Sequence, residues 1–162
     1  MILKGSATNV TSATTLSRAT RIRVGATNAG TVTIAAPVGT FNAETSVAGA
    51  AITISSHGFT TGDEVTYSDG GGTAIAELTD GVNYYVKVVD ANTINLCNDI
   101  IQDNTSITLT DGSSENHTIT AAKTYAGTVV LVANQVIIID KQPSDTIACT
   151  SAMSCTAVGS QP

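Results

Sequence analysis

Residues 57–96 read HGFTTGDEVTYSDGGGTAIAELTDGVNYYVKVVDANTINL. Turn-forming residues at positions 61–63, 79–81 and 90–92 cut this stretch into short segments in which apolar and polar residues alternate. In the clearest segment, four apolar side chains share one side of a period-2 ribbon, namely Val82, Tyr84, Val86 and Val88. The other side carries Asn83, Tyr85 and Lys87. The pattern predicts strands joined by turns.

The composition also favours an all-β fold. The chain has 162 residues and a mass of 16.4 kDa, which allows one ordinary domain or two small ones. Hydrophobic residues make up 42% of the chain, but aromatic residues make up only 4% and there is no Trp. Val, Ile, Ala and Thr methyl groups must therefore fill the core, which suits a small β-sandwich or barrel.

The acidic charge argues against nucleic acid as a partner. The formal net charge is −6 and the seven Lys and Arg residues are scattered, whereas phosphate binding requires clustered cations. The single local group is Arg18, Arg21 and Arg23. On a strand, Arg21 and Arg23 share one face, which is either solvated, paired across an interface, or directed at an acidic surface of another protein.

The three cysteines, Cys97, Cys149 and Cys155, fit neither a disulfide framework nor a zinc cluster. We interpret them as buried small residues, and a bond between Cys149 and Cys155 stays open as an alternative. The longest apolar run, residues 129–139, is shorter than the ~18–20 residues of a membrane helix. No export signal is recognised, so we expect folding in a reducing cytoplasm and no membrane contact.

The pattern divides the chain into an outer β unit, residues 1–40 plus 123–162, and an inserted β module, residues 41–122. In the outer unit we expect strands at residues 20–24, 30–35, 127–133, 135–140, 146–149 and 153–158. The first four of these are interpreted as two hairpins. In the module we expect strands at residues 51–55, 64–67, 82–88, 93–96, 106–110 and 117–120. Isolated hairpins are marginal in water, so the two ends of the chain are expected to complete each other.

No constellation of catalytic residues is recognised, and the chain is not expected to be an enzyme. Both imidazoles, His57 and His117, flank turns, and neither has a nucleophile and an orienting carboxylate in a pattern that predicts a triad. The glycines at 70–72 are followed by no helix, so they predict no phosphate site. Aspartates at strand ends leave calcium as an alternative, but no D-x-D-x-D-G loop is present, and no metal or other cofactor is predicted.

The inserted module resembles a β repeat found in bacteriophage virion proteins and large bacterial surface proteins. The resemblance rests on the segments HGFTTGDEVTY at 57–67, GG at 71–72, LTDG at 78–81, YYV at 84–86 and VDANTINL at 89–96. The flanking segments are similar to small structural proteins of phages that infect aquatic bacteria, at residues 22–24, 30–34, 136–141 and 143–147. No catalytic residues come with the resemblance.

A single copy of the repeat without an export signal favours a virion component over a long adhesin. Among such components, a short acidic all-β chain resembles capsid decoration or cement proteins, which sit on the major capsid lattice and are often trimeric. The resemblance thus implies a homotrimer on the outer capsid surface, with the outer unit on the major capsid protein and the module projecting outward. The alternatives are a head–tail connector, tail or baseplate protein, and a host-surface or glycan-binding module.

Candidate partner-contacting residues lie on expected strand edges and exposed faces. The edges at residues 31–35 and 136–140 are expected to pair with neighbouring chains by strand addition. The Tyr84–Tyr85 pair places one ring on each face of its strand, so one ring is expected in the core and the other is available for a contact. The candidates are Arg21, Arg23, Thr31, Thr33, Val136, Ile138 and Tyr85.

Overall fold

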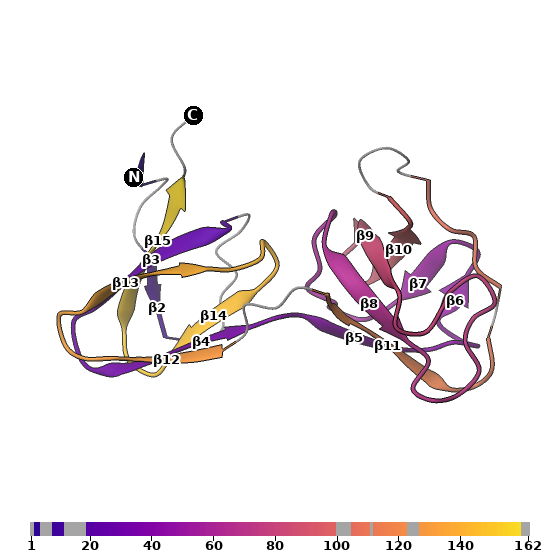
Figure 1. Ribbon diagram of the computed structural model, residues 1–162, viewed down its shortest axis with the longest axis horizontal. Helices are drawn as coiled ribbons and strands as arrows, with labels where there is room; N and C mark the ends of the chain where they lie inside the picture. Colours follow the sequence, from indigo (N-terminus) through magenta and orange to yellow (C-terminus); the bar gives the residue numbers. More distant parts are fainter. Residues whose placement is uncertain are drawn as a thin grey trace. The chain divides into compact units, whose positions relative to one another are not determined.

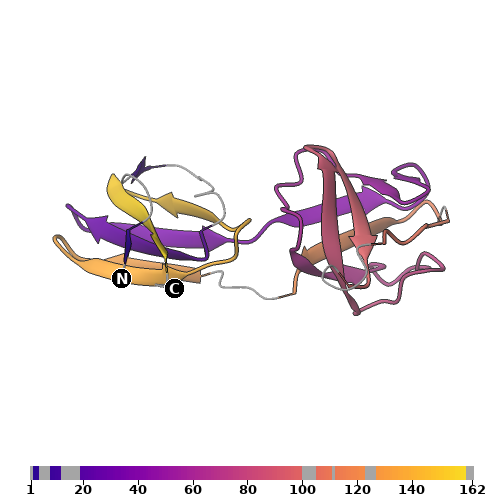
Figure 2. The same cartoon turned by 90° about the horizontal axis from the view of Figure 1, so that it is seen from above.

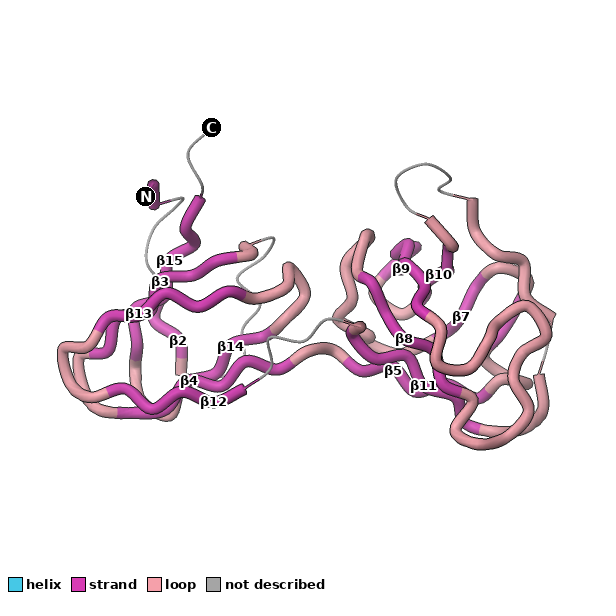
Figure 3. The backbone as a smooth tube through the Cα atoms, in the orientation of Figure 1, coloured by secondary structure: helices cyan, strands magenta, loops and turns pink. Residues whose placement is uncertain are grey.

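The computed structural model describes residues 2–3, 8–11, 19–99, 105–110, 112–122 and 127–159. These residues form fifteen β-strands and no helix (Figures 1 and 3), which confirms the all-β prediction. The chain splits into two compact units, which we call unit 1 (Met1–Ala36 and Thr124–Pro162) and unit 2 (Pro37–Lys123). The inserted unit thus begins a few residues before position 41, because residues 38–42 form a strand within it.

The described residues of unit 1 form eight strands. Their bounds are β1 (Ile2–Leu3), β2 (Thr8–Val10), β3 (Arg21–Ala26), β4 (Gly30–Ala35), β12 (Gly127–Leu131), β13 (Val136–Asp140), β14 (Thr146–Cys149) and β15 (Met153–Gly159). They form two antiparallel sheets, one with the order β1-β15-β3-β13, in which β2 also pairs with β15, and one with the order β12-β4-β14.

The two sheets of unit 1 are built from three bent strand paths. β3 continues into β4, β12 into β13, and β14 into β15, and each path places its two strands in different sheets. Figure 2 shows the orange β12–β13 path on one side of the purple β3–β4 path and the yellow β14–β15 path on the other. The β3–β4 path is therefore central, and the β12–β13 path lies at the edge of both sheets.

The two hairpins predicted for unit 1 are wrong, because the chain bends at these places instead of reversing within one sheet. The segments on either side of residues 25–29 do not pair with each other, and neither do those on either side of residues 133–134. Instead the corners of neighbouring paths bond together: Ala26 N–H donates to Gln135 O (2.9 Å), and Asn134 N–H donates to Ala26 O (2.8 Å). Asn134 has a φ of +64°, which Asn tolerates better than most residues. The chain here turns from one sheet into the other.

The side chains between the two sheets form the core of unit 1. The three-stranded sheet contributes Val32, Ile34, Leu131, Ile147 and Cys149, and the five-stranded sheet contributes Val10, Ile22, Val24, Ala26, Met153 and Cys155. Alternate residues of β3, β4 and β14 are buried, as the period-2 pattern requires. Two antiparallel sheets that share one core make unit 1 a small β-sandwich.

Unit 2 contains one antiparallel sheet in the order β5-β11-β8-β9-β10-β7-β6. The bounds of these strands are β5 (Val38–Asn42), β6 (Val47–Ala48), β7 (Ala51–Thr53), β8 (Glu64–Ser68), β9 (Asn83–Asp90), β10 (Thr93–Cys97) and β11 (Asn116–Ala121). The strand expected at residues 106–110 is wrong. Only Ser106 forms a bridge, because Ile107 N–H donates to β10 whereas Leu109 N–H donates to the turn between β6 and β7.

All seven strands of this sheet contribute to the single core of unit 2. The buried strand residues are Phe41, Val47, Ile52, Val65, Tyr67, Tyr84, Val86, Ile94, Leu96 and Ile119. At Gly39 of β5, an added Cβ would lie 2.9 Å from Ile54 Cδ1 and 3.0 Å from Phe59 Cε2. The sheet therefore curls until β5 approaches the segment after β7, but no sheet closes into a barrel among the described residues.

Candidate interaction edge

The two histidines form hydrogen bonds within unit 2. His57 Nδ1 accepts from Phe59 N–H (3.0 Å), so Nε2 carries the proton and donates to Asp90 O (2.8 Å). His117 Nδ1 is hydrogen-bonded to Tyr67 Oη at 2.7 Å, and both side chains are fully buried. In the hydrogen bonds found for the described residues, neither imidazole contacts a carboxylate side chain. The HGF segment thus fastens a loop onto the end of β9.

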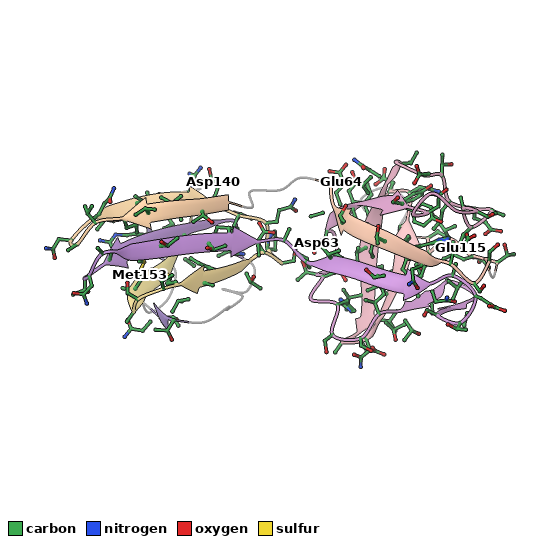
Figure 4. The ribbon with its side chains drawn as sticks, turned by 90° about the horizontal axis from the view of Figure 1, so that it is seen from below. Asp63, Glu64, Glu115, Asp140 and Met153 are labelled. Carbon is green, nitrogen blue, oxygen red and sulfur yellow. The ribbon has the colours of Figure 1, made fainter. Side chains whose placement is uncertain are left out.

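The carboxylates of unit 2 also bind backbone groups. Asp63, which is labelled in Figure 4 and precedes β8, accepts from both Thr60 N–H (2.8 Å) and Thr60 Oγ1–H (2.9 Å). Beside the glycines at 70–72, Glu115 accepts from Thr73 N–H at 2.7 Å. Within the described ranges, no group of three His, Cys, Asp or Glu side chains is arranged to hold a metal ion. These acidic side chains stabilise turns.

The cysteines are buried and are not linked by disulfides. Cys149 of β14 and Cys155 of β15 come from different sheets of unit 1 and belong to its core. Burial raises the pKa of both thiols, that of Cys155 to about 12. The pair that the sequence left open as a disulfide is a pair of free thiols here.

A free edge remains on unit 1, formed by β12 and β13. Each of these strands is the last in its sheet, so only one side of it is paired by the residues that the structure describes. Five of the eight large apolar side chains that are exposed among the described residues lie on it, namely Val129, Val130, Val132, Val136 and Ile138. We call residues 127–140 the β12–β13 edge, and Figure 4 labels its last residue, Asp140.

One row of backbone groups on β13 points outward. Lys141 N–H donates to Thr20 O and Ala26 N–H donates to Gln135 O, both at 2.9 Å, so the odd-numbered residues bond to β3. Paired residues alternate in an antiparallel ladder, and the N–H and C=O of Val136, Ile138 and Asp140 therefore face away from β3. No hydrogen bond of the described residues involves these backbone groups. They are donors and acceptors for a further strand.

Residues 127–139 lack the charges and prolines that usually protect an edge strand against pairing. β13 also pairs with β3 without a bulge. Asp140 is the single charge, and Arg21 Nε donates to its Oδ1 at 2.6 Å. This bond lowers the pKa of the Asp140 carboxyl and raises that of Arg21. Proteins that avoid edge pairing place charges, prolines or bulges there.

Four of the sequence-predicted contact residues lie together on the solvent face of β3 and β13. Arg21 is paired with Asp140 and Arg23 with Ile138 in the strand register. The Arg23 guanidinium extends toward Gly25, where its Nη1 is 3.8 Å and Val136 Cγ2 is 3.9 Å from the position that a Cβ would occupy. The arginines therefore border the apolar edge.

The other predicted contacts lie elsewhere. Thr31 and Thr33 belong to β4, which is paired on both sides by β12 and β14, so the edge expected at residues 31–35 is wrong. Tyr85 lies in β9 of unit 2 and is half-buried, while Tyr84 is in the core. Arg18 lies outside the described residues. Sequence reasoning missed the β12 part of the edge, although the apolar run at 129–139 was its signal.

Comparisons of the chain with protein-family models, with curated proteins and with solved structures gave no match. In the part of the chain that the structure describes, no helix is long and apolar enough to cross a membrane. The functional conclusion therefore rests on the geometry of the β12–β13 edge and on the sequence itself.

Proposed function

We propose that this chain is a non-enzymatic structural protein that joins a larger assembly by strand addition at the β12–β13 edge. The observation that carries the proposal is the coincidence of an outward row of backbone groups with five exposed apolar side chains on one uncharged edge. The imidazoles, by contrast, are engaged in bonds within the fold. Contact with other chains is the activity that such a surface supports.

Strand addition supplies both specificity and affinity. Each main-chain hydrogen bond contributes about 0.5–1.5 kcal/mol net. Burial of the apolar side chains adds about 25 cal/mol per Å² before the costs of association are subtracted. A single contact of this kind is modest, but several copies that bind one repetitive surface hold together at high effective concentration. A repetitive shell is therefore the kind of surface on which this edge is most effective.

We take that shell to be the capsid of a bacteriophage, with this chain as a decoration or cement protein on its outer surface. Three features support this assignment: the resemblance of residues 57–96 to a β repeat of virion proteins, the acidic and charge-poor composition, and the unprotected edge on unit 1. Unit 1 is the part that contacts the major capsid protein, and unit 2 is the inserted module. Assembly takes place in the host cytoplasm.

The copy number in purified particles tests this function. Quantitative mass spectrometry of the phage that encodes the chain should give a copy number comparable with that of the major capsid protein, because decoration follows the lattice. A few copies per particle, set by the symmetry of a tail or connector, would contradict decoration and favour the alternative location. Absence from the particles would contradict both.

A pair of matched variants then tests the edge. Val130 on β12 is 74% exposed and Val89 on β9 of unit 2 is 58% exposed. Binding is measured between the recombinant chain and capsid shells from which this chain is absent. Val130→Lys places a charge on the edge and should abolish this binding. Val89→Lys should bind as the unmodified chain does. Equal binding of the two variants would exclude the β12–β13 edge as the shell contact.

A further inference from the structure

We propose that the β13 half of this edge binds β13 of a second copy of the chain, antiparallel about a twofold axis at Ile138. The inference rests on the proposed function in one respect, that the edge is a site of strand pairing, and it names the occupant of one half of that site. β12 remains available to the larger assembly.

The register about Ile138 uses every outward backbone group of β13. Ile138 faces Ile138 of the second copy, and Val136 faces Asp140 of the second copy. Each of the three residues then exchanges two hydrogen bonds with its opposite residue, at a Cα separation of about 5.5 Å. A register displaced by two residues leaves at least one of the three without a partner. The backbone alone therefore selects this twofold arrangement.

The same register gives Arg23 a counter-charge. Its guanidinium and the Val136 side chain both border Gly25, since Nη1 and Val136 Cγ2 are 3.8 and 3.9 Å from the position that a Cβ would occupy there. Val136 is the residue that faces Asp140 of the second copy. Among the described residues no acidic side chain is found paired with Arg23. The second copy thus brings a carboxylate toward an arginine for which the described residues of its own chain supply none.

Self-pairing also keeps the two carboxylates apart. The two Asp140 side chains lie at opposite ends of the paired strands, each bonded to Arg21 of its own chain and placed opposite Val136 of the other. At the centre the two Ile138 side chains, each 51% exposed in the single chain, cover each other. A surface that is complementary to itself under a twofold rotation is what a closed dimer requires.

Charge variants at position 138 test the proposal with the full chain in solution. Sedimentation equilibrium should show a dimer for the unmodified chain. Ile138→Lys and Ile138→Glu should each weaken the dimer by about tenfold or more, since residue 138 then opposes its own charge. A 1:1 mixture of the two variants should restore the dimer as a heterodimer. Val89→Lys, a comparably exposed position in unit 2, should leave the dimer unchanged.

Three results would overturn the twofold pairing. They are a monomer over a broad micromolar range for the unmodified chain, a trimer as the resemblance to decoration proteins implies, and a mixture of the two charge variants that stays monomeric. Circular dichroism of each variant shows whether it is folded before its oligomeric state is interpreted. The result for the unmodified chain needs no such check. Failure of the dimer leaves shell binding by Val130 untouched, so the two proposals fail separately.

Discussion

The hydrogen bonds around Tyr67 predict a large loss of stability for Tyr67→Phe. Tyr67 Oη accepts from Ile75 N–H (3.1 Å) and is bonded to His117 Nδ1 (2.7 Å) in the core of unit 2. Burial raises the pKa of the Tyr67 phenol, so the hydroxyl keeps its proton. Phe retains the shape of the ring and lacks only the oxygen. The substitution therefore removes two hydrogen bonds and almost no packing.

The expected loss is about 2–6 kcal/mol, because a buried polar group without a hydrogen bond costs roughly 1–3 kcal/mol and the variant leaves two of them. These are Ile75 N–H and His117 Nδ1. The His117 imidazole has no second hydrogen bond among the described residues, since its Nε2 is buried without a partner there. For a unit of this size, the melting temperature should fall by about 10 °C or more.

Urea denaturation of the full chain, followed by circular dichroism, measures the loss. The matched control is Tyr84→Phe, which removes a single bond from Thr79 N–H (2.9 Å) at a partly buried site and should cost about 1 kcal/mol. Hydrogen exchange of the Ile75 amide should accelerate in Tyr67→Phe and stay slow in the control. If Tyr67→Phe loses no more stability than Tyr84→Phe, the account of this buried pair is refuted.

Two further predictions concern Asp63 and the thiols. Asp63→Ala removes the acceptor for both Thr60 donors and should cost about 1.5–3 kcal/mol in the same denaturation assay, while Asp63→Asn keeps one acceptor oxygen and should lose less; equal losses would contradict the assignment. The thiol of Cys155, with a pKa of about 12, should stay protonated and unreactive toward a thiol reagent at pH 8 in the native chain. All three cysteines should react after denaturation, and rapid reaction of native Cys155 would count against its burial.

The positions of many strands could be predicted because turn residues and the period-2 pattern agree locally. The predicted segments 30–35 and 146–149 coincide with β4 and β14. β5 was missed because Gly39 interrupts the strand pattern. In the structure Gly39 pairs with Ile119 of β11, and Ile54 and Phe59 leave no room for a side chain there. That reason is a tertiary contact, which a local pattern does not contain.

Strand partners were less predictable than strand positions. The segments of β3 and β4 have the pattern of a hairpin, and only the register shows that each pairs with a different strand of the returning chain. The alternation of apolar and polar residues predicts which side chains are buried. This alternation is the same whether the chain reverses within one sheet or bends into a second sheet. The error at residues 31–35 followed directly, because a strand at the centre of a sheet was taken for an edge.

The candidate edge shows why its function is hard to infer from residue types. Strand addition depends on main-chain hydrogen-bonding groups, which nearly every residue carries. The residues of β13 therefore need only be uncharged and β-branched, and none of them may be Pro. Many core strands meet the same conditions, and Val136 and Ile138 resemble them in sequence. What separates them is that no described strand pairs with the far side of β13. If the second copy covers that side, Arg23 is the residue whose sequence position carries information, because its counter-charge comes from the other chain.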